Sequence, residues 1–202
     1  MEYYIHHIPI FLVGDGTPLI DVEAFAAAAK ETIPERLLNN VDVIYLGDTR
    51  ELHGRNAAYH NGAIYMTDKE PTIEDMLENF VHEVAHSLEN SYGLQIYTDA
   101  LIQEFKGKRR RLYHLLSAEG YEINQIHFEF TEYNQAFDSF LADEVGYPTL
   151  LTLTMGLFAS PYAATSIQEY FANGFEKYFL QSPRSVRMVS PVLYDILEEI
   201  IN

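Results

Sequence analysis

The chain has 202 residues, of which 48% are hydrophobic and 21% charged, so it can form one globular domain with a substantial core. It contains no cysteine, which excludes disulfides, thiolate-bound metals and a cysteine nucleophile. The formal net charge of −17 argues against a nucleic-acid partner, because nothing general in the chain attracts phosphate.

The first part of the chain is predicted to form strands and one helix. Apolar and β-branched runs mark the strands, and an Ala-rich segment with apolar residues at helical spacing marks the helix. The expected elements are a strand over residues 5–13, a helix over residues 21–31, a helical turn over residues 34–38, and strands over residues 41–46 and 63–66. Between the last two strands lies a polar stretch over residues 49–61.

The remainder is predicted to be helical, which together with the first part indicates an α+β fold. The expected helices cover residues 72–90, 98–118, 132–144, 149–158, 166–180 and 192–201. The second of these helices contains a basic run over residues 106–111. We expect this run to be a solvated helix face; a docking site for an anionic partner is the alternative.

The location of the protein stays open at this point. The first residues have no basic segment ahead of an apolar run, so we expect no signal peptide, and no stretch is apolar for long enough to span a bilayer. The protein is therefore either cytoplasmic or secreted after loss of a leader.

The helix over residues 72–90 carries the run His82-Glu83-Val84-Ala85-His86. The two histidines are four residues apart, so both imidazoles project from one side of the helix, away from its apolar stripe, and can reach one metal ion. Glu83 is rotated by about 100° from His82 and can address a water molecule on that metal. This is the His-Glu-x-x-His arrangement of zinc peptidases, and a surface helix with two solvated histidines is the alternative.

A zinc peptidase needs a third protein ligand. The metzincin pattern would require Gly and His where the chain has Glu89 and Tyr92, so that class is excluded. The best placed carboxylate is Glu169, in the helix over residues 166–180, whose apolar face holds it in the core. The spacing Ser166-x-x-Glu169 equally indicates a capping box, and the pattern alone does not decide between ligand and cap.

These residues resemble those of a known family. The run His82-Glu83-Val84-Ala85-His86, followed by Tyr162 and by Glu169-Tyr170-Phe171-Ala172-Asn173-Gly174-Phe175, is similar to the catalytic domain of anthrax lethal factor and to the related Pro-Pro endopeptidases. The seven-residue offset from Tyr162 to Glu169 matches the family spacing. The likeness is specific over residues 78–90 and 160–180.

The resemblance implies a single zincin-like domain over residues 1–202, with an N-terminal subdomain over residues 1–92 that includes the active-site helix and a helical subdomain over residues 93–202. His82, His86 and Glu169 would bind one zinc ion, Glu83 would be the general base, and Tyr162 would stabilise the oxyanion. The chain departs from the family in two places. Residues 95–145 lengthen the usual connection and are an expected insertion, and Asn173 stands where the family often has an acidic residue.

The expected function is therefore that of a zinc metalloendopeptidase. Zinc-activated water would attack a peptide carbonyl while the strand over residues 63–66 binds an extended peptide by edge pairing. We expect a peptide or protein substrate, no nucleic-acid or membrane partner, and a monomer. The alternatives are a non-catalytic peptide- or protein-binding member of the same fold, and a zinc hydrolase that acts on a non-peptide substrate.

Overall fold

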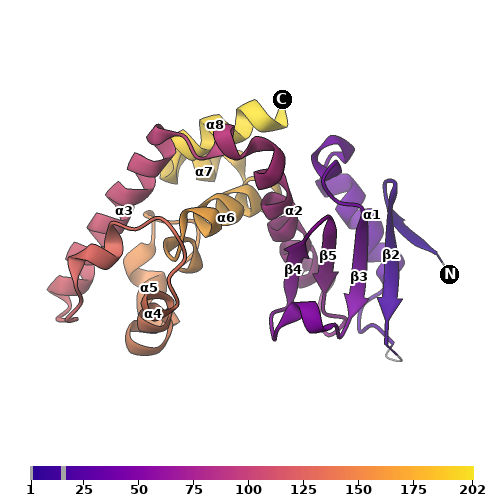
Figure 1. The fold of residues 1–202 in the computed structure, drawn as a ribbon, viewed down its shortest axis with the longest axis horizontal. Helices are drawn as coiled ribbons and strands as arrows, with labels where there is room; N and C mark the ends of the chain where they lie inside the picture. Colours follow the sequence, from indigo (N-terminus) through magenta and orange to yellow (C-terminus); the bar gives the residue numbers. More distant parts are fainter. Residues whose placement is uncertain (1, 15–16) are drawn as a thin grey trace. The chain divides into compact units, whose positions relative to one another are not determined.

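The first half of the chain forms a five-stranded mixed sheet in the computed structural model, which describes residues 2–14 and 17–202. The parallel strands β2, β3 and β5 form its centre, and the antiparallel strands β1 and β4 form its two edges. In spatial order the strands are β1 (Tyr3–Ile5), β2 (Ile8–Val13), β3 (Val43–Gly47), β5 (Ala63–Met66) and β4 (Ala57–His60), as Figure 1 shows. With the helices described below, this sheet confirms the α+β class.

Two strand predictions were wrong. The single strand expected over residues 5–13 is two strands, β1 and β2, which pair antiparallel around a turn where His6 takes a φ of 50°. The strand over residues 63–66 is not an edge strand, since β5 pairs with β3 on one side and with β4 on the other. The edge is β4, within the polar stretch over residues 49–61, in which no strand was predicted.

The turn between β4 and β5 explains this error. Asn61 and Gly62 have φ values of 48° and 85°, the left-handed conformations that a two-residue hairpin turn needs and that Asn-Gly supplies most readily. Asn61-Gly62 was therefore a hairpin signal in the sequence, and it makes the residues before it, Ala57–His60, the partner strand of β5.

Two helices cover one face of the sheet. They are α1 (Val22–Thr32), whose N-terminus is capped by the Asp21 carboxylate, and α2 (Ile73–Ile96); both lie behind the strands in Figure 1. Phe25 of α1 meets Phe80 of α2 edge to face, with ring centroids 5.9 Å apart. The strand residues that pack beneath them are apolar and alternate along each strand, as expected for a half-buried sheet: Ile8, Ile10, Ile44, Leu46, Ile64 and Met66.

The opposite face of the sheet carries a row of aromatic side chains. Phe11, Tyr45 and Tyr65 occupy matching positions on β2, β3 and β5. Their rings stack, with centroids 6.0 Å apart for the first pair and 5.3 Å for the second. Cross-strand aromatic pairs of this kind stabilise the pairing of the strands that bear them.

The chain divides into two compact units, Met1–Tyr92 and Gly93–Asn202, and the boundary falls within α2. The second unit is helical throughout its described elements. No helix among residues 2–14 and 17–202 is long and apolar enough to cross a membrane. The α-helices of the second unit are α3 (Asp99–Ala118), α4 (Gln135–Ser139), α5 (Tyr147–Thr154), α6 (Ile167–Leu180), α7 (Pro183–Val189) and α8 (Pro191–Ile201).

Short helical segments complete the structure. A π-helical stretch, η4 (Phe140–Val145), continues α4, and the other segments are single 3₁₀ turns: η1 (Glu35–Leu38), η2 (Arg50–Leu52), η3 (Gln125–Phe128) and η5 (Tyr162–Ala164). Within the segment expected to be an insertion, residues 95–145, the structure therefore has α3, η3, α4 and η4.

The basic run of α3 is not the solvated face that we expected. Lys108 and Arg109 are buried in the second unit, with 9% and 1% of their surface exposed. The Lys108 ammonium donates to the carbonyl oxygens of Leu157 and Val189 and to the Ser190 hydroxyl, at 2.6 to 2.9 Å. Buried charges persist where hydrogen bonds replace water in this way.

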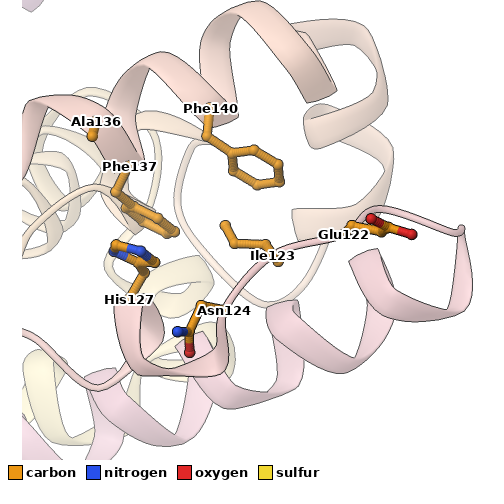
Figure 2. A pocket seen from close by; sticks show the side chains of 7 residues that line it. All are labelled: Glu122, Ile123, Asn124, His127, Ala136, Phe137 and Phe140. Atoms are coloured by element: carbon orange, nitrogen blue, oxygen red, sulfur yellow. The ribbon is translucent and has the colours of Figure 1, made fainter.

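Arg109 is held by a different set of partners. Its guanidinium donates to the carbonyl oxygens of His127 and Phe130 and lies over the ring of Phe137, 4.2 Å from the centroid. Phe137 also borders a cavity of about 230 Å³ between α4 and the loop that follows α3 (Figure 2). The cavity is mostly apolar and contains none of the predicted metal ligands; its lining is Glu122, Ile123, Asn124, His127, Ala136, Phe137 and Phe140.

Candidate metal centre

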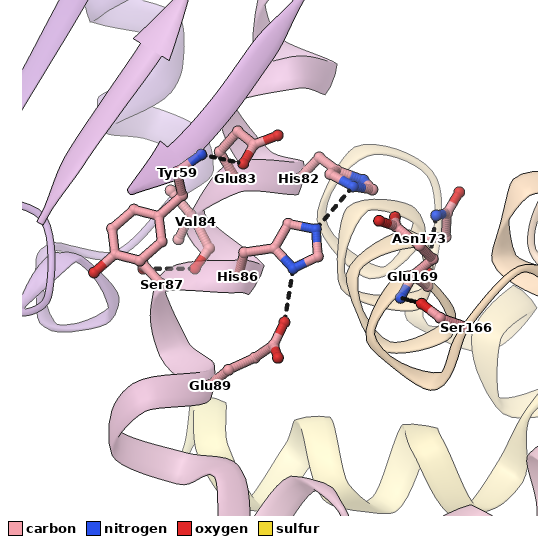
Figure 3. Close-up of polar contacts among 10 residues, drawn as sticks. All are labelled: Tyr59, His82, Glu83, Val84, His86, Ser87, Glu89, Ser166, Glu169 and Asn173. Atoms are coloured by element: carbon pink, nitrogen blue, oxygen red, sulfur yellow. Dashed lines mark hydrogen bonds and ion pairs between the residues drawn. The ribbon is translucent and has the colours of Figure 1, made fainter. Parts of the chain in front are cut away.

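The helix α2 presents two histidines on the side away from the core of the first unit. Its apolar side chains at helical spacing, among them Phe80 and Val84, are fully buried, whereas His82 and His86 are half-buried. The Nε2 atoms of the two imidazoles lie 3.2 Å apart (Figure 3). Two ligands at about 2.1 Å from one tetrahedral zinc ion would be separated by about 3.4 Å, so these nitrogens are spaced as a shared metal requires.

Glu89 orients the His86 imidazole. Its Oε1 lies 2.7 Å from His86 Nδ1, one turn further along α2. A carboxylate oxygen accepts this hydrogen bond, so His86 Nδ1 is the donor and Nε2 is the ring nitrogen left to face a metal. A carboxylate behind a ligating histidine is the usual means of fixing its tautomer and ring orientation.

Glu83, the expected general base, is turned toward the sheet. Only 8% of its surface is exposed, and its Oε2 accepts a hydrogen bond of 2.6 Å from the backbone N–H of Tyr59 in β4 (Figure 3). The motif glutamate is thereby attached to the edge strand of the sheet.

Glu169 lies in the first turn of α6. Its backbone N–H donates to the Ser166 hydroxyl, 3.1 Å away, which is the serine half of the predicted capping box. The cap therefore uses a backbone atom of Glu169 and not its carboxylate. The ligand and cap interpretations are compatible, because they use different atoms of the same residue.

His82, His86 and Glu169 form a group that can hold a metal ion. One nitrogen of each imidazole and one oxygen of the carboxylate lie within 4.8 Å of one another. Within residues 2–14 and 17–202 this is the single group of three or more His, Asp or Glu side chains so arranged. Two neutral imidazoles and one carboxylate are a donor set that zinc accepts in catalytic sites, so the residues fit the predicted ion.

Tyr162 begins the turn η5, just ahead of α6, and is half-buried. Two residues that the sequence did not single out for this purpose hold the turn. The Ser160 hydroxyl accepts from the Ala163 N–H at 3.2 Å and donates to Asn173 Oδ1 at 2.5 Å. Asn173 in turn donates to the backbone carbonyl of Glu169 at 2.8 Å. Asn173 thus connects the turn that carries Tyr162 to the helix that carries Glu169.

Several site residues were not found from the sequence. Tyr59 lies in the polar stretch over residues 49–61, in which no strand was predicted, and the Asn61-Gly62 pair was the signal in the sequence that a strand precedes it. Glu89 was considered solely as evidence against the metzincin pattern, although its spacing of three residues from His86 already placed it beside that imidazole. Nothing in the sequence related Ser160 to Asn173, since their contact depends on the tertiary fold.

No family model, no curated protein and no solved structure matches this chain. The site must therefore be interpreted from its own residues and their geometry.

Proposed function

We propose that this protein is a zinc-dependent metalloendopeptidase with a zincin-like fold, similar to the lethal factor and Pro-Pro endopeptidase family. The observation that carries the proposal is the group formed by His82, His86 and Glu169, with Glu83 beside it on the same helix as the two histidines. A storage or structural site would have no use for a buried carboxylate next to the ligands, whereas hydrolysis needs a base at that place.

Each residue has a distinct role in this proposal. A bound zinc ion supplies Lewis acidity toward the water and the peptide carbonyl. Glu83 takes a proton from the attacking water and delivers it to the leaving amine. The Tyr162 hydroxyl donates a hydrogen bond to the oxyanion as it develops. Glu89 keeps the His86 lone pair directed at the ion.

The edge strand supports a peptide substrate in particular. An extended peptide can add to an exposed strand edge through main-chain hydrogen bonds. That role, first expected of residues 63–66, now falls to β4, because β5 is paired on both sides. The net charge of −17 favours a cationic or neutral peptide over an acidic one.

The decisive experiment combines metal analysis with a cleavage screen. The purified protein is expected to contain about one zinc ion per chain and to cleave members of a peptide library, and a chelator should abolish this cleavage. Glu83→Gln should keep its zinc and lose turnover by roughly 10²–10⁴-fold, because the amide cannot accept the proton. The matched control is Glu74→Gln, an exposed position in the first turn of α2, which should cleave like the wild type.

The non-catalytic alternative gives a different result in the same screen. A zinc-bound protein that binds peptides without cutting any of them would be the non-catalytic member of the fold. Full peptide cleavage by Glu83→Gln would contradict the role given to Glu83.

Replacement of Tyr162 separates its role from that of the ligands. Tyr162→Phe should lower turnover by about 10- to 100-fold, because one oxyanion donor is lost. Its zinc content should equal that of the wild type, since the phenol is not a ligand. A variant that loses zinc along with activity would show that Tyr162 supports the metal instead.

A further inference from the structure

The contact between Glu83 and Tyr59 uses a backbone N–H of β4, the edge strand on which a peptide substrate would pair. In a two-residue hairpin the residues flanking the turn, His60 and Ala63, form a hydrogen-bonded pair, and hydrogen-bonded and non-hydrogen-bonded pairs alternate along the ladder. Tyr59 faces Ile64 in a non-hydrogen-bonded pair. Its N–H and C=O therefore point away from β5, toward the side where another strand would add.

Glu83 already occupies this outward N–H. The distance of 2.6 Å from Tyr59 N to Glu83 Oε2 is that of a strong, charge-assisted hydrogen bond. A peptide that pairs fully with β4 opposite Tyr59 must place a carbonyl oxygen on the same N–H. Carboxylate and substrate carbonyl are thus competitors for one donor.

The side chain of Tyr59 holds this donor in place. The phenol oxygen donates to the Asn40 carbonyl at 3.0 Å and accepts from the Gly62 N–H and from Asn90 Nδ2, both at 3.2 Å. One donor and two acceptor sites are all that a phenol offers, so the hydroxyl is saturated. Because Asn90 lies in α2, Tyr59 is fixed to the active-site helix through both its backbone and its ring.

We propose that the Tyr59 amide is the resting partner of Glu83, and that an extended peptide pairing with β4 takes over this amide and releases the Glu83 carboxylate. The inference rests on the proposed function, which it extends to regulation: the base becomes available when the substrate backbone is in register with the edge strand. Tyr59 is accordingly a positioning residue for Glu83. A peptide that fails to reach the Tyr59 position leaves the base attached to the strand.

Hydrogen exchange at single amides tests the resting contact without any substrate. The Tyr59 amide should be protected in the wild type and exchange at least about tenfold faster in Glu83→Ala, whereas Glu83→Gln, which keeps an acceptor oxygen, should be intermediate. The Ala57 amide is the internal reference, because it also points away from β5 and should not respond. Unchanged exchange at Tyr59 in Glu83→Ala would overturn the proposal.

Peptide binding tests the competition. The probe is a blocked hexapeptide of alternating Val and Lys, which favours the extended form and complements the net charge. Zinc-loaded Glu83→Ala should bind it about fivefold more tightly than zinc-loaded Glu83→Gln, because no side chain competes for the Tyr59 N–H. Equal binding, weaker binding or no binding to either variant would contradict the proposal. Tyr59→Pro, which lacks the donor and suits an edge position, should lose the affinity in both backgrounds.

The two experiments also separate this inference from the proposed function. If the wild type cleaves no peptide while the Tyr59 amide still responds to Glu83 replacement, the peptidase assignment fails alone. If the wild type cleaves peptides and the exchange rate of the Tyr59 amide does not change when Glu83 is replaced, only the release mechanism fails.

Discussion

Glu89 contributes to the candidate metal site although it is not one of the three candidate ligands. Its carboxylate accepts from His86 Nδ1 at 2.7 Å and is four-fifths buried, so little water competes with this contact. Such a partner fixes the orientation of the imidazole. If the group formed by His82, His86 and Glu169 holds a metal ion, its affinity for that ion should depend partly on Glu89.

Replacement of Glu89 should weaken metal binding while leaving the fold intact. We expect Glu89→Gln to raise the zinc dissociation constant by about 10- to 100-fold, since the neutral amide orients His86 less strongly. Competition with a chromogenic chelator measures this constant, and Glu74→Gln on the same helix should match the wild type. Equal zinc affinity in both variants would remove Glu89 from the site.

At the scale of whole elements, α6 and α8 approach each other closely at Gly174. A Cβ atom on this residue would clash with Leu193 Cδ2, and its distance from Leu193 Cγ would be 3.2 Å. Glycine is otherwise costly inside a helix, by roughly 0.5–1 kcal/mol relative to alanine. Gly174 is present because it permits this close contact between the helices.

Two glycine replacements should therefore have opposite effects. Gly174→Ala is expected to lower the free energy of unfolding by about 1–3 kcal/mol, because the buried Leu193 must move. Gly107→Ala, in the exposed middle of α3 with no atom near its added methyl group, should raise this free energy by up to about 1 kcal/mol. Urea denaturation measures both values. A stabilised Gly174→Ala would contradict the packing described here.

The elements differ in how well the sequence predicted them. Helix α6 was expected within one residue of its observed limits, because the period of an apolar stripe is a local property. The start of α2 was also expected within one residue, but the helix continues to Ile96, beyond the expected end at residue 90. The four-residue strand β4 is too short for a period to be recognised, and its partner had to be inferred from the turn. Helix α7, which begins at Pro183 directly after its N-cap residue Ser182, was missed entirely.

The basic run over residues 106–111 differs, because the helical spacing of its buried residues is visible in the sequence and the prediction was still wrong. Lys108 and Arg109 continue the buried stripe of α3 that includes Phe105 and Leu112. Their charge suggested a solvated face. Only the tertiary structure shows the carbonyl oxygens and rings that make their burial possible, so the position was predictable and the environment was not.

At the scale of the whole molecule, the burial of Lys108 makes stability depend on pH. Burial lowers the pKa of Lys108 to about 8, against the attraction of Glu104. An unfolded lysine keeps its proton up to about pH 10.4. Between pH 8 and pH 10 the unfolded chain thus binds more protons than the folded chain at this site, and the free energy of unfolding rises with pH.

This contribution can be measured as a difference. The free energy of unfolding of the wild type minus that of Lys108→Met should increase between pH 7.5 and pH 9.5, by up to about 2 kcal/mol. Lys69→Met, at an exposed site, should show no such trend against the wild type. A difference that stays constant or falls with pH would show that Lys108 keeps its charge throughout this range.

The Glu83–Tyr59 contact has a consequence for association between copies of the protein. An edge strand with free outward N–H groups is a template on which a strand of another chain can grow, and proteins guard such edges with charge or with short strands. β4 is short, and its Tyr59 donor is covered by a carboxylate of its own chain. Glu83, the catalytic glutamate of the proposed enzyme, thus also protects the edge of the sheet. Its removal should leave the Tyr59 N–H open to a strand of another copy as well as to substrate.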